Sequence, residues 1–142
     1  MEEGVLRSIR GLLRIGTLLS MLVRRCDPTK ASEVSAEGAS GVAMQMLMGR
    51  ADATPNFAMR HFVVAPGGHT PRHSHPWEHE VYVTEGVLRT ECGGESIEVF
   101  AGDALLIPGD ATHQFVNESD AQARFLCMVP LESECGRDVP GS

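Results

Sequence analysis

Short runs of alternating apolar and polar residues, separated by glycine, proline, asparagine and aspartate, constrain the fold of this chain more than any other feature. Side chains alternate between the two faces of an extended strand, so such runs are typical of strands with one buried face. The runs expected to form strands are 42–49, 56–65, 73–75, 79–85, 87–92, 96–100, 104–107, 113–116 and 124–130. Many short strands with turn residues between them predict an all-β barrel or sandwich.

Four of the six histidines have the spacing of metal ligands. His73 and His75 are one residue apart, so on an extended backbone both imidazoles point to the same side. His79 begins the next predicted strand, and His113 begins a strand that follows a Pro-Gly-Asp turn at 108–110. Imidazole is a good ligand for Zn, Fe, Ni and Cu, so these four residues predict a site for one divalent metal ion.

At these positions the chain resembles the cupin superfamily, whose two motifs are G-x5-H-x-H-x3,4-E-x6-G and G-x5-P-x-G-x2-H-x3-N. The residues that match are Gly67, His73, His75, His79, Gly86, Gly102, Pro108, His113 and Asn117. The resemblance covers about residues 42–131 and is closest to small single-domain cupins with an all-histidine metal site. It implies the cupin double-stranded β-helix, a jelly-roll barrel with the metal inside.

Two positions depart from the family motifs. The family usually has glutamate as its third ligand, and this chain offers either His79 or Glu80 there. Six residues separate His79 from Gly86, as the motif requires, so His79 is the predicted ligand and Glu80 the alternative. Asp110 stands where the family turn has glycine. Aspartate tolerates the left-handed backbone conformation better than most residues, so the turn is expected to form.

The length predicts one domain with two peripheral segments. Residues 42–131 are assigned to the barrel, 1–41 to an N-terminal extension and 132–142 to a C-terminal tail. Apolar residues within 1–25 are spaced as on one side of a helix, with arginines between them. This segment is interpreted either as an amphipathic helix or as a loosely ordered extension, and the second is favoured. Residues 27–41 are small and polar and are expected to form loops.

Charge and cysteine content bound the partners and the compartment. The formal net charge of -7, without a basic run in the barrel segment, argues against a nucleic-acid partner. Arginines and glycines interrupt 1–25, which excludes a membrane span there. The cysteines are Cys26, Cys92, Cys127 and Cys135, without a C-x-x-C pair. They predict reduced thiols and a cytoplasmic protein, with a Cys92–Cys127 disulfide as the alternative.

The cavity is expected to be apolar and to attract an anion. Four neutral imidazoles would leave the charge of a divalent ion uncompensated, which favours a carboxylate or an enolate. Its expected walls are Val81, Val83 and Phe115. In a regular register, Arg60, Glu80 and Tyr82 would point away from the cavity. Ligand chemistry does not choose the metal among Zn, Fe, Ni and Cu, and the resemblance adds Mn.

The strand at 56–65 can face the cavity in two registers. In one register Phe57, Met59 and His61 point inward, and His61 supplies a group for proton transfer. In the other, Ala58, Arg60 and Phe62 point inward, and Arg60 supplies a cation for an anionic substrate. Outside the motifs, His61 and His69 are expected to be bystanders rather than ligands. Trp77 is expected to pack over the rim of the site.

The expected partner is a small-molecule ligand or substrate, and three classes of function are consistent with the predicted site. The sequence does not assign a catalytic residue. The first is a metal-dependent dioxygenase acting on a small anionic or dicarbonyl substrate, a class that the resemblance supports. The second is a redox-neutral isomerase or lyase, which needs an inward acid or base. The third is a non-catalytic module that binds a small ligand or a metal, because a fold alone does not determine function. The resemblance also implies a homodimer that pairs through the early strands.

Overall fold

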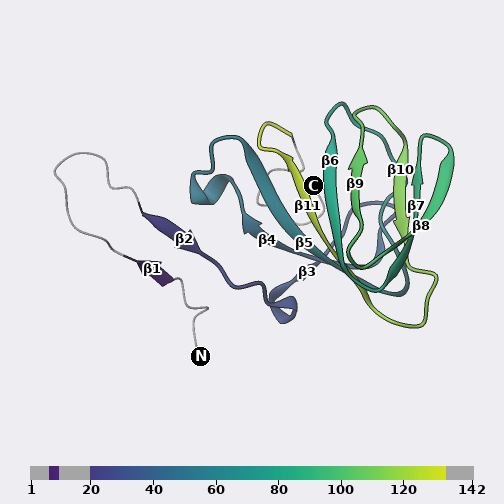
Figure 1. Cartoon of the computed structure of the whole chain (residues 1–142), viewed down its shortest axis with the longest axis horizontal. Coiled ribbons are helices and arrows are strands. Elements are labelled where there is room, and N and C mark those ends of the chain that lie inside the picture. The colour runs from purple at the N-terminus through teal and green to yellow at the C-terminus, as the bar shows by residue number, and fades with distance from the viewer. Residues whose placement is uncertain (1–6, 10–19, 134–142) are drawn as a thin grey trace.

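A computed structural model describes residues 7–9 and 20–133 (Figure 1). Its strands follow the alternation of apolar side chains, which bury one face of each strand. The strands of the barrel are β3 (Ser32–Glu33), β4 (Ser40–Met48), β5 (Phe57–His69), β6 (His79–Glu85), β7 (Val87–Cys92), β8 (Glu95–Phe100), β9 (Ala104–Ile107), β10 (His113–Val116) and β11 (Ala123–Pro130). The prediction of an all-β jelly-roll barrel is confirmed.

The strands form one antiparallel sheet that curls over itself, as Figure 1 shows. Its order is β8-β7-β10-β5-β11-β6-β9, and β4 and β3 continue from β5. β5 pairs with β4 and β11 along its first part and with β10 at His69. Three phenylalanine rings from β5, β10 and β11 pack together in the interior. The Phe125 ring stacks on Phe62, with centroids 4.9 Å apart, and on Phe115, with centroids 4.8 Å apart.

Strict alternation along β6 fixes which side chains enter the barrel. His79, Val81 and Val83 are buried, whereas Glu80 and Tyr82 between them are exposed. The same pattern buries every second residue of β11. These β11 residues are Ala123, Phe125, Cys127 and Val129. The first histidine of β6 therefore lies on the inner face together with the core of β11.

Asn117, the last residue of the second motif, has a structural role. Its side chain is fully buried, and its amide nitrogen donates to the carbonyls of Val64 at 3.0 Å and Ala121 at 2.8 Å. Its side-chain oxygen accepts from the backbone and the hydroxyl of Ser119. Asn117 thereby ties the turn after β10 to β5, because buried polar groups are stable only when they are hydrogen-bonded.

One predicted strand, 73–75, is wrong. These residues lie in a loop, where His73 forms a single bridge with His113. Pro71 and Pro76 flank the segment and have no backbone N–H, so a continuous ladder cannot form there. The strand predicted at 56–65 was too short at its C-terminal end, since β5 continues to His69. Gly67 adopts a φ of +76° within it, a conformation that residues with a side chain rarely take.

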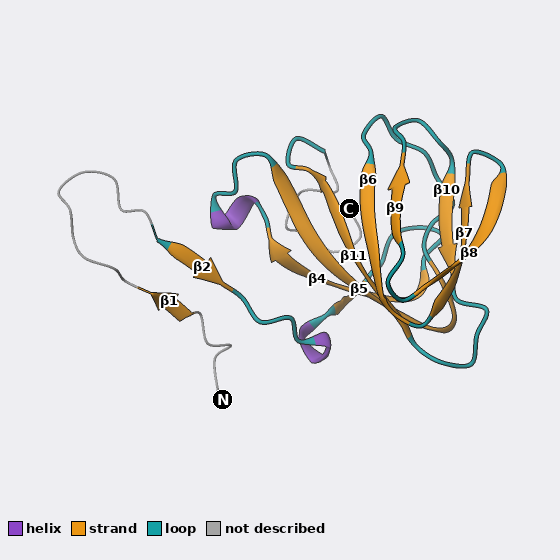
Figure 2. Cartoon of the chain, in the orientation of Figure 1, coloured by secondary structure: helices purple, strands orange, loops and turns teal. Residues whose placement is uncertain are grey.

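The two described segments of the N-terminal 25 residues that have regular structure are strands, not a helix. β1 (Arg7–Ile9) pairs with β2 (Met21–Val23) in a separate two-stranded sheet that lies apart from the barrel in Figure 1. The helical interpretation is therefore wrong for these two segments, and the rest of 1–19 lies outside the described residues. Figure 2 shows helical turns at η1 (Pro28–Lys30) and η2 (Arg50–Asp52).

The segment 27–41 is less loop-like than expected. β3 pairs with β4, and Val34 is buried in the core of the barrel, where its N–H donates to the carbonyl of Val42 at 2.9 Å.

Within the described residues, no helix has the length and apolar character needed to cross a membrane.

Candidate metal centre

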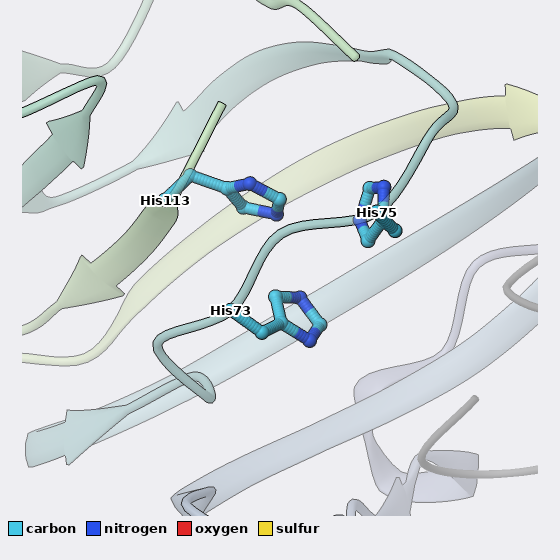
Figure 3. A group of neighbouring side chains, drawn as sticks. All are labelled: His73, His75 and His113. Carbon is cyan, nitrogen blue, oxygen red and sulfur yellow. The ribbon is translucent and has the colours of Figure 1, made fainter. Parts of the chain in front are cut away.

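Histidines from three parts of the chain meet at one place, where His79 and His113 are buried, His75 is partly buried and His73 is exposed. The imidazole nitrogens of His73 and His75 in the loop and of His113 at the start of β10 lie within 4.8 Å of one another (Figure 3). His79 lies beside them at the start of β6, with its Nε2 at 2.7 Å from Nε2 of His75. Its ring centroid is 5.0 Å from that of His113. All four sequence-predicted histidines are thus brought together.

Backbone hydrogen bonds hold the histidine loop against the β9–β10 turn. The N–H of His73 donates to the carbonyl of His113 at 3.2 Å, and the N–H of His113 donates back at 2.9 Å. The N–H of Asp110 donates to the carbonyl of His75 at 2.7 Å. Asp110 has a φ of +66°, so the turn forms with aspartate in the left-handed conformation, as expected. Next to it, a Cβ on Gly109 would overlap the carbonyl of Pro76.

Three of the histidines have a hydrogen-bonding partner at Nδ1, the ring nitrogen closer to the backbone. Nδ1 of His75 lies 2.9 Å from the carbonyl of Trp77, and Nδ1 of His113 lies 2.8 Å from the carbonyl of Ala111. Nδ1 of His79 lies 3.2 Å from Sγ of Cys127. Such partners orient the ring and leave Nε2 for a metal ion. The Trp77 ring also stacks on His75 at 4.5 Å, in agreement with the packing expected there.

Partial or full burial favours the neutral form of His73, His75 and His79. Burial lowers the pKa of His73 to about 4. It also lowers the pKa of His75, and the positive charge of His113 is the second cause there. The pKa of His79 falls further, first through burial and then through the positive charge of Arg60. A neutral imidazole offers the nitrogen lone pair that a metal requires. The cluster is therefore ready to bind a cation at neutral pH.

Three of the four histidines, His73, His79 and His113, form part of the wall of a small, mostly apolar cavity of about 80 Å³. Its lining residues are Val34, Ala36, Val42, Met44, Arg60, Phe62, Thr70, Pro71, His73, His79, His113, Phe115, Phe125 and Cys127. Phe115 lines the cavity as expected, whereas Val81 and Val83 are buried in the core and do not line it. This volume holds several water molecules, each of which needs about 10–15 Å³ by this measure.

The register of β5 is the one that brings Arg60 inward. Ala58, Arg60 and Phe62 are buried, and Arg60 lies opposite Cys127 in the ladder with β11. Its guanidinium stands over the Phe62 ring, 5.0 Å from the centroid, and Nη2 donates to Sγ of Cys127 at 3.2 Å. The expectation that Arg60 faces away from the cavity is therefore wrong, because the long β5 enters the curled part of the sheet with this face inward.

Other candidate residues lie away from the cluster. Glu80 is exposed on the outer face of β6, the side opposite to His79. His61 is buried, but it lies outside the cavity lining, and burial lowers its pKa. His69 ends β5, with Nδ1 at 3.3 Å from the carbonyl of Thr70. His61 and His69 thus lie outside both the histidine cluster and the cavity lining.

The sequence analysis missed the role of Cys127. No disulfide joins Cys92 to Cys127 in the described part of the chain, so the alternative Cys92–Cys127 disulfide is wrong, and Cys135 lies outside the described residues. Cys127 is buried and contacts both His79 and Arg60. The alternation along 123–129 predicts an inward side chain at this position. Which residues it would meet depended on the neighbours of β11 in the sheet.

Comparisons with known proteins agree with this architecture. The model of the Cupin domain family matches residues 60–129. The polyketide cyclase RemF from Streptomyces resistomycificus is 36% identical in sequence and has a TM-score of 0.71, with 78% of this chain and 80% of that chain covered. Rru_A2000 from Rhodospirillum rubrum, a cupin-2 domain, is 27% identical with a TM-score of 0.65, over 80% and 82% of the two chains.

Curated relatives match over shorter regions. Polyketide synthase CurC from Streptomyces cyaneus is 38% identical over 65 residues, which are 45% of this chain and 42% of that protein. The 1-methylthio-D-xylulose 5-phosphate methylsulfurylase of Rhodospirillum rubrum is 37% identical over 82 residues, which are 58% and 50%. The chain thus spans about half the length of the curated relatives it matches.

The lowered histidine pKa values predict how the stability of the metal-free protein depends on pH. An unfolded histidine has a pKa of about 6.5, so between 6.5 and about 4 the unfolded chain binds more protons than the folded one. The free energy of unfolding should therefore fall as the pH is lowered through this range. Urea unfolding at several pH values measures this dependence. The control is His79→Gln, which should make it shallower, and equal slopes would contradict the assignment.

Proposed function

Because the chain belongs to the cupin superfamily, we propose that it is a metal-dependent enzyme whose ion is held by His73, His75, His79 and His113. The clustering of these imidazoles beside an apolar cavity is the observation that carries the proposal. Neutral nitrogen donors with hydrogen-bonded Nδ1 atoms suit a borderline divalent ion such as Zn, Fe, Ni or Cu. Mn remains a candidate through the family.

The ligand set is tested by two neighbouring substitutions. His79→Ala removes a proposed ligand and should lower the affinity for Zn²⁺ by more than the roughly 10–100-fold that loss of an outer partner costs. Glu80→Ala, the matched control on the exposed face, should leave the affinity unchanged. Isothermal titration calorimetry on chelator-treated protein measures both. Full affinity in His79→Ala would reduce the set to His73, His75 and His113, and loss in Glu80→Ala alone would overturn it.

The cavity favours the enolizable dicarbonyl end of an apolar substrate. A divalent ion held by the histidines would supply Lewis-acid chemistry and polarise a carbonyl oxygen. The buried guanidinium of Arg60 adds a fixed positive charge that stabilises an enolate or a carboxylate. Phe62, Phe115 and Phe125 contribute apolar surface and exclude water. A cavity of about 80 Å³ accommodates the reacting end of a molecule rather than several fused rings.

The reaction proposed first is redox-neutral formation of a carbon–carbon bond within such a substrate. The α-carbon loses a proton and bonds to a second carbonyl carbon, whose oxygen gains a proton, so no oxidant is consumed. The names of RemF, a polyketide cyclase, and CurC, a polyketide synthase, support a substrate with several carbonyl groups. The second candidate is a dioxygenase acting on the same dicarbonyl unit, which uses the same cation and ligand set but consumes O2.

Oxygen consumption distinguishes the two reactions. Metal-loaded protein is incubated with pentane-2,4-dione and with a linear tri-β-ketone, while an oxygen electrode and mass spectrometry follow the products. Cyclisation gives a product of unchanged mass, or one lighter by water, at constant O2, whereas a dioxygenase adds both oxygen atoms. Arg60→Met should lower kcat/KM by about 10- to 150-fold, since a charge-assisted hydrogen bond contributes about 1.5–3 kcal/mol. No turnover of either compound by protein loaded with each candidate metal would favour a binding module.

We also propose a homodimer that forms through the outer face of the barrel. Phe57, Tyr82 and Leu106 are exposed there by 53%, 48% and 60%, and Met59 and Leu126 adjoin them. Contiguous exposed apolar side chains of this kind mark protein–protein interfaces. In sedimentation equilibrium the protein should be dimeric at micromolar concentration and Leu106→Glu monomeric. A wild-type protein that is monomeric at tens of micromolar would contradict the proposal.

A further inference from the structure

The exposed part of the cavity wall lies at one place in the described structure. Most of the side chains that line the cavity are buried, and the four that are not are Ala36, Thr70, Pro71 and His73. They come from two segments, the turn that precedes β4 and the loop that follows β5. The entrance to the cavity therefore lies between this turn and this loop.

The loop side of the entrance is tied to β10 by hydrogen bonds. The N–H of Thr70 donates to the carbonyl of Phe115 at 2.9 Å, and the Thr70 hydroxyl accepts from the N–H of Phe115 at 2.9 Å. The side-chain amide of Gln114 donates to the Thr70 carbonyl at 3.0 Å, and the N–H of His73 donates to the carbonyl of His113 at 3.2 Å. This side of the entrance therefore keeps its position.

The turn side is held by packing instead. Within the described part of the chain, residues 35–39 form one backbone hydrogen bond, from the N–H of Ala39 to the carbonyl of Ala36 at 3.0 Å, and it lies inside the turn. The turn rests on the loop at Gly38, where a Cβ would lie 3.6 Å from Cα of Pro71. A segment without hydrogen bonds to the sheet opens locally at low cost in free energy, so the turn can move while the loop stays in place.

The interior is too small for a long substrate. Phe62, Phe115 and Phe125 line its buried part with stacked rings. Since the volume of about 80 Å³ holds only the reacting end of a molecule, the remainder has to extend through the entrance. The side chains of Ala36 and Pro71 make this passage apolar, which favours a hydrocarbon chain. An extended chain also needs a narrower opening than a rigid system of fused rings.

We infer that Ala36 is the specificity-determining residue of this site. Its small side chain leaves room for a linear apolar chain, and the 36–39 turn lifts from Pro71 to admit that chain. The inference rests on the proposed function and names its substrate class, a flexible chain that carries the dicarbonyl unit at one end. A larger side chain at position 36 narrows the passage, whereas the clustered histidines belong to the loop, β6 and β10.

Two diketones of different length test the role of Ala36. Isothermal titration calorimetry on Zn²⁺-loaded protein compares pentane-2,4-dione with dodecane-2,4-dione. Ala36→Leu should bind dodecane-2,4-dione at least about tenfold more weakly than wild type, because each methylene group kept in water weakens binding by about fourfold. Its affinity for pentane-2,4-dione should be unchanged, because this short molecule needs no room in the entrance.

Ser35→Leu is the matched control for Ala36→Leu. Ser35 is the exposed neighbour of Ala36 in the chain and lies outside the cavity lining. This variant should bind both diketones as the wild type does. If wild type binds both diketones and the two variants have equal affinity for dodecane-2,4-dione, the inference is wrong and the proposed function stands.

A reversible bridge tests the movement of the turn. A Cβ on Gly38 would lie 3.7 Å from Cβ of Pro71, and a disulfide requires about 3.5–4.5 Å between these atoms. The oxidised Gly38→Cys/Pro71→Cys protein should bind dodecane-2,4-dione at least about tenfold more weakly than the same protein reduced with a phosphine. Both forms carry the strain of a side chain at Gly38, whose φ is +86°, so the comparison isolates the bridge. Equal affinity in the two forms would overturn the inference.

A metal-free measurement separates the inference from the proposed function. Decan-2-one supplies a chain without the second carbonyl group, and methyl resonances of chelator-treated protein follow its entry. The Ala36 and Val34 methyl groups should shift in the wild type, and the Val34 shift in Ala36→Leu should require at least about tenfold more ketone. If Zn²⁺-loaded wild type binds neither diketone but these shifts occur, the proposed function fails and the entrance stands. If neither methyl group responds in the wild type, the inference fails.

Discussion

The pair of backbone hydrogen bonds between His73 and His113 is the interaction on which the candidate metal centre depends. The loop that carries His73 and His75 has prolines on both sides and belongs to no strand, so no continuous ladder fixes its path. Together with the bond from Asp110 to His75, this bridge fixes two ligand positions against a third that is distant in sequence. The turn needs glycine at position 109, because the loop passes so close that a side chain there would overlap the carbonyl of Pro76.

Charge is the second constraint on the site. Burial favours neutral histidines, yet the cation of Arg60 is also buried in the same wall. An ion bound by neutral ligands would add charge of the same sign in a place where water screens it poorly. An anionic ligand in the cavity would offset both charges. The proposals for the metal and for an enolate or carboxylate substrate are therefore physically coupled, although they are tested separately.

The partners of the histidines differ in a way that the strand pairing explains. His75 and His113 lie where the chain turns, so nearby carbonyls reach their rings. His79 is the first residue of β6, where it pairs with Ile107 of β9. Its Nδ1 faces a side chain of the neighbouring strand β11, the thiol of Cys127.

The sequence alone determined most strands of the barrel and the four histidines, because both leave local patterns. The alternation of apolar residues located β6, β7 and β9 at their observed bounds, and the motif spacing selected all four clustered histidines. The left-handed Asp110 was also predictable, since the preference belongs to the residue itself.

Only the tertiary structure decided the inward register of β5, the inclusion of Val34 in the core and the contact of Cys127 with His79 and Arg60. Each depends on which distant strands become neighbours and on how the sheet curls. A period of two residues permits either face to be inward, and the partners across the sheet select between them.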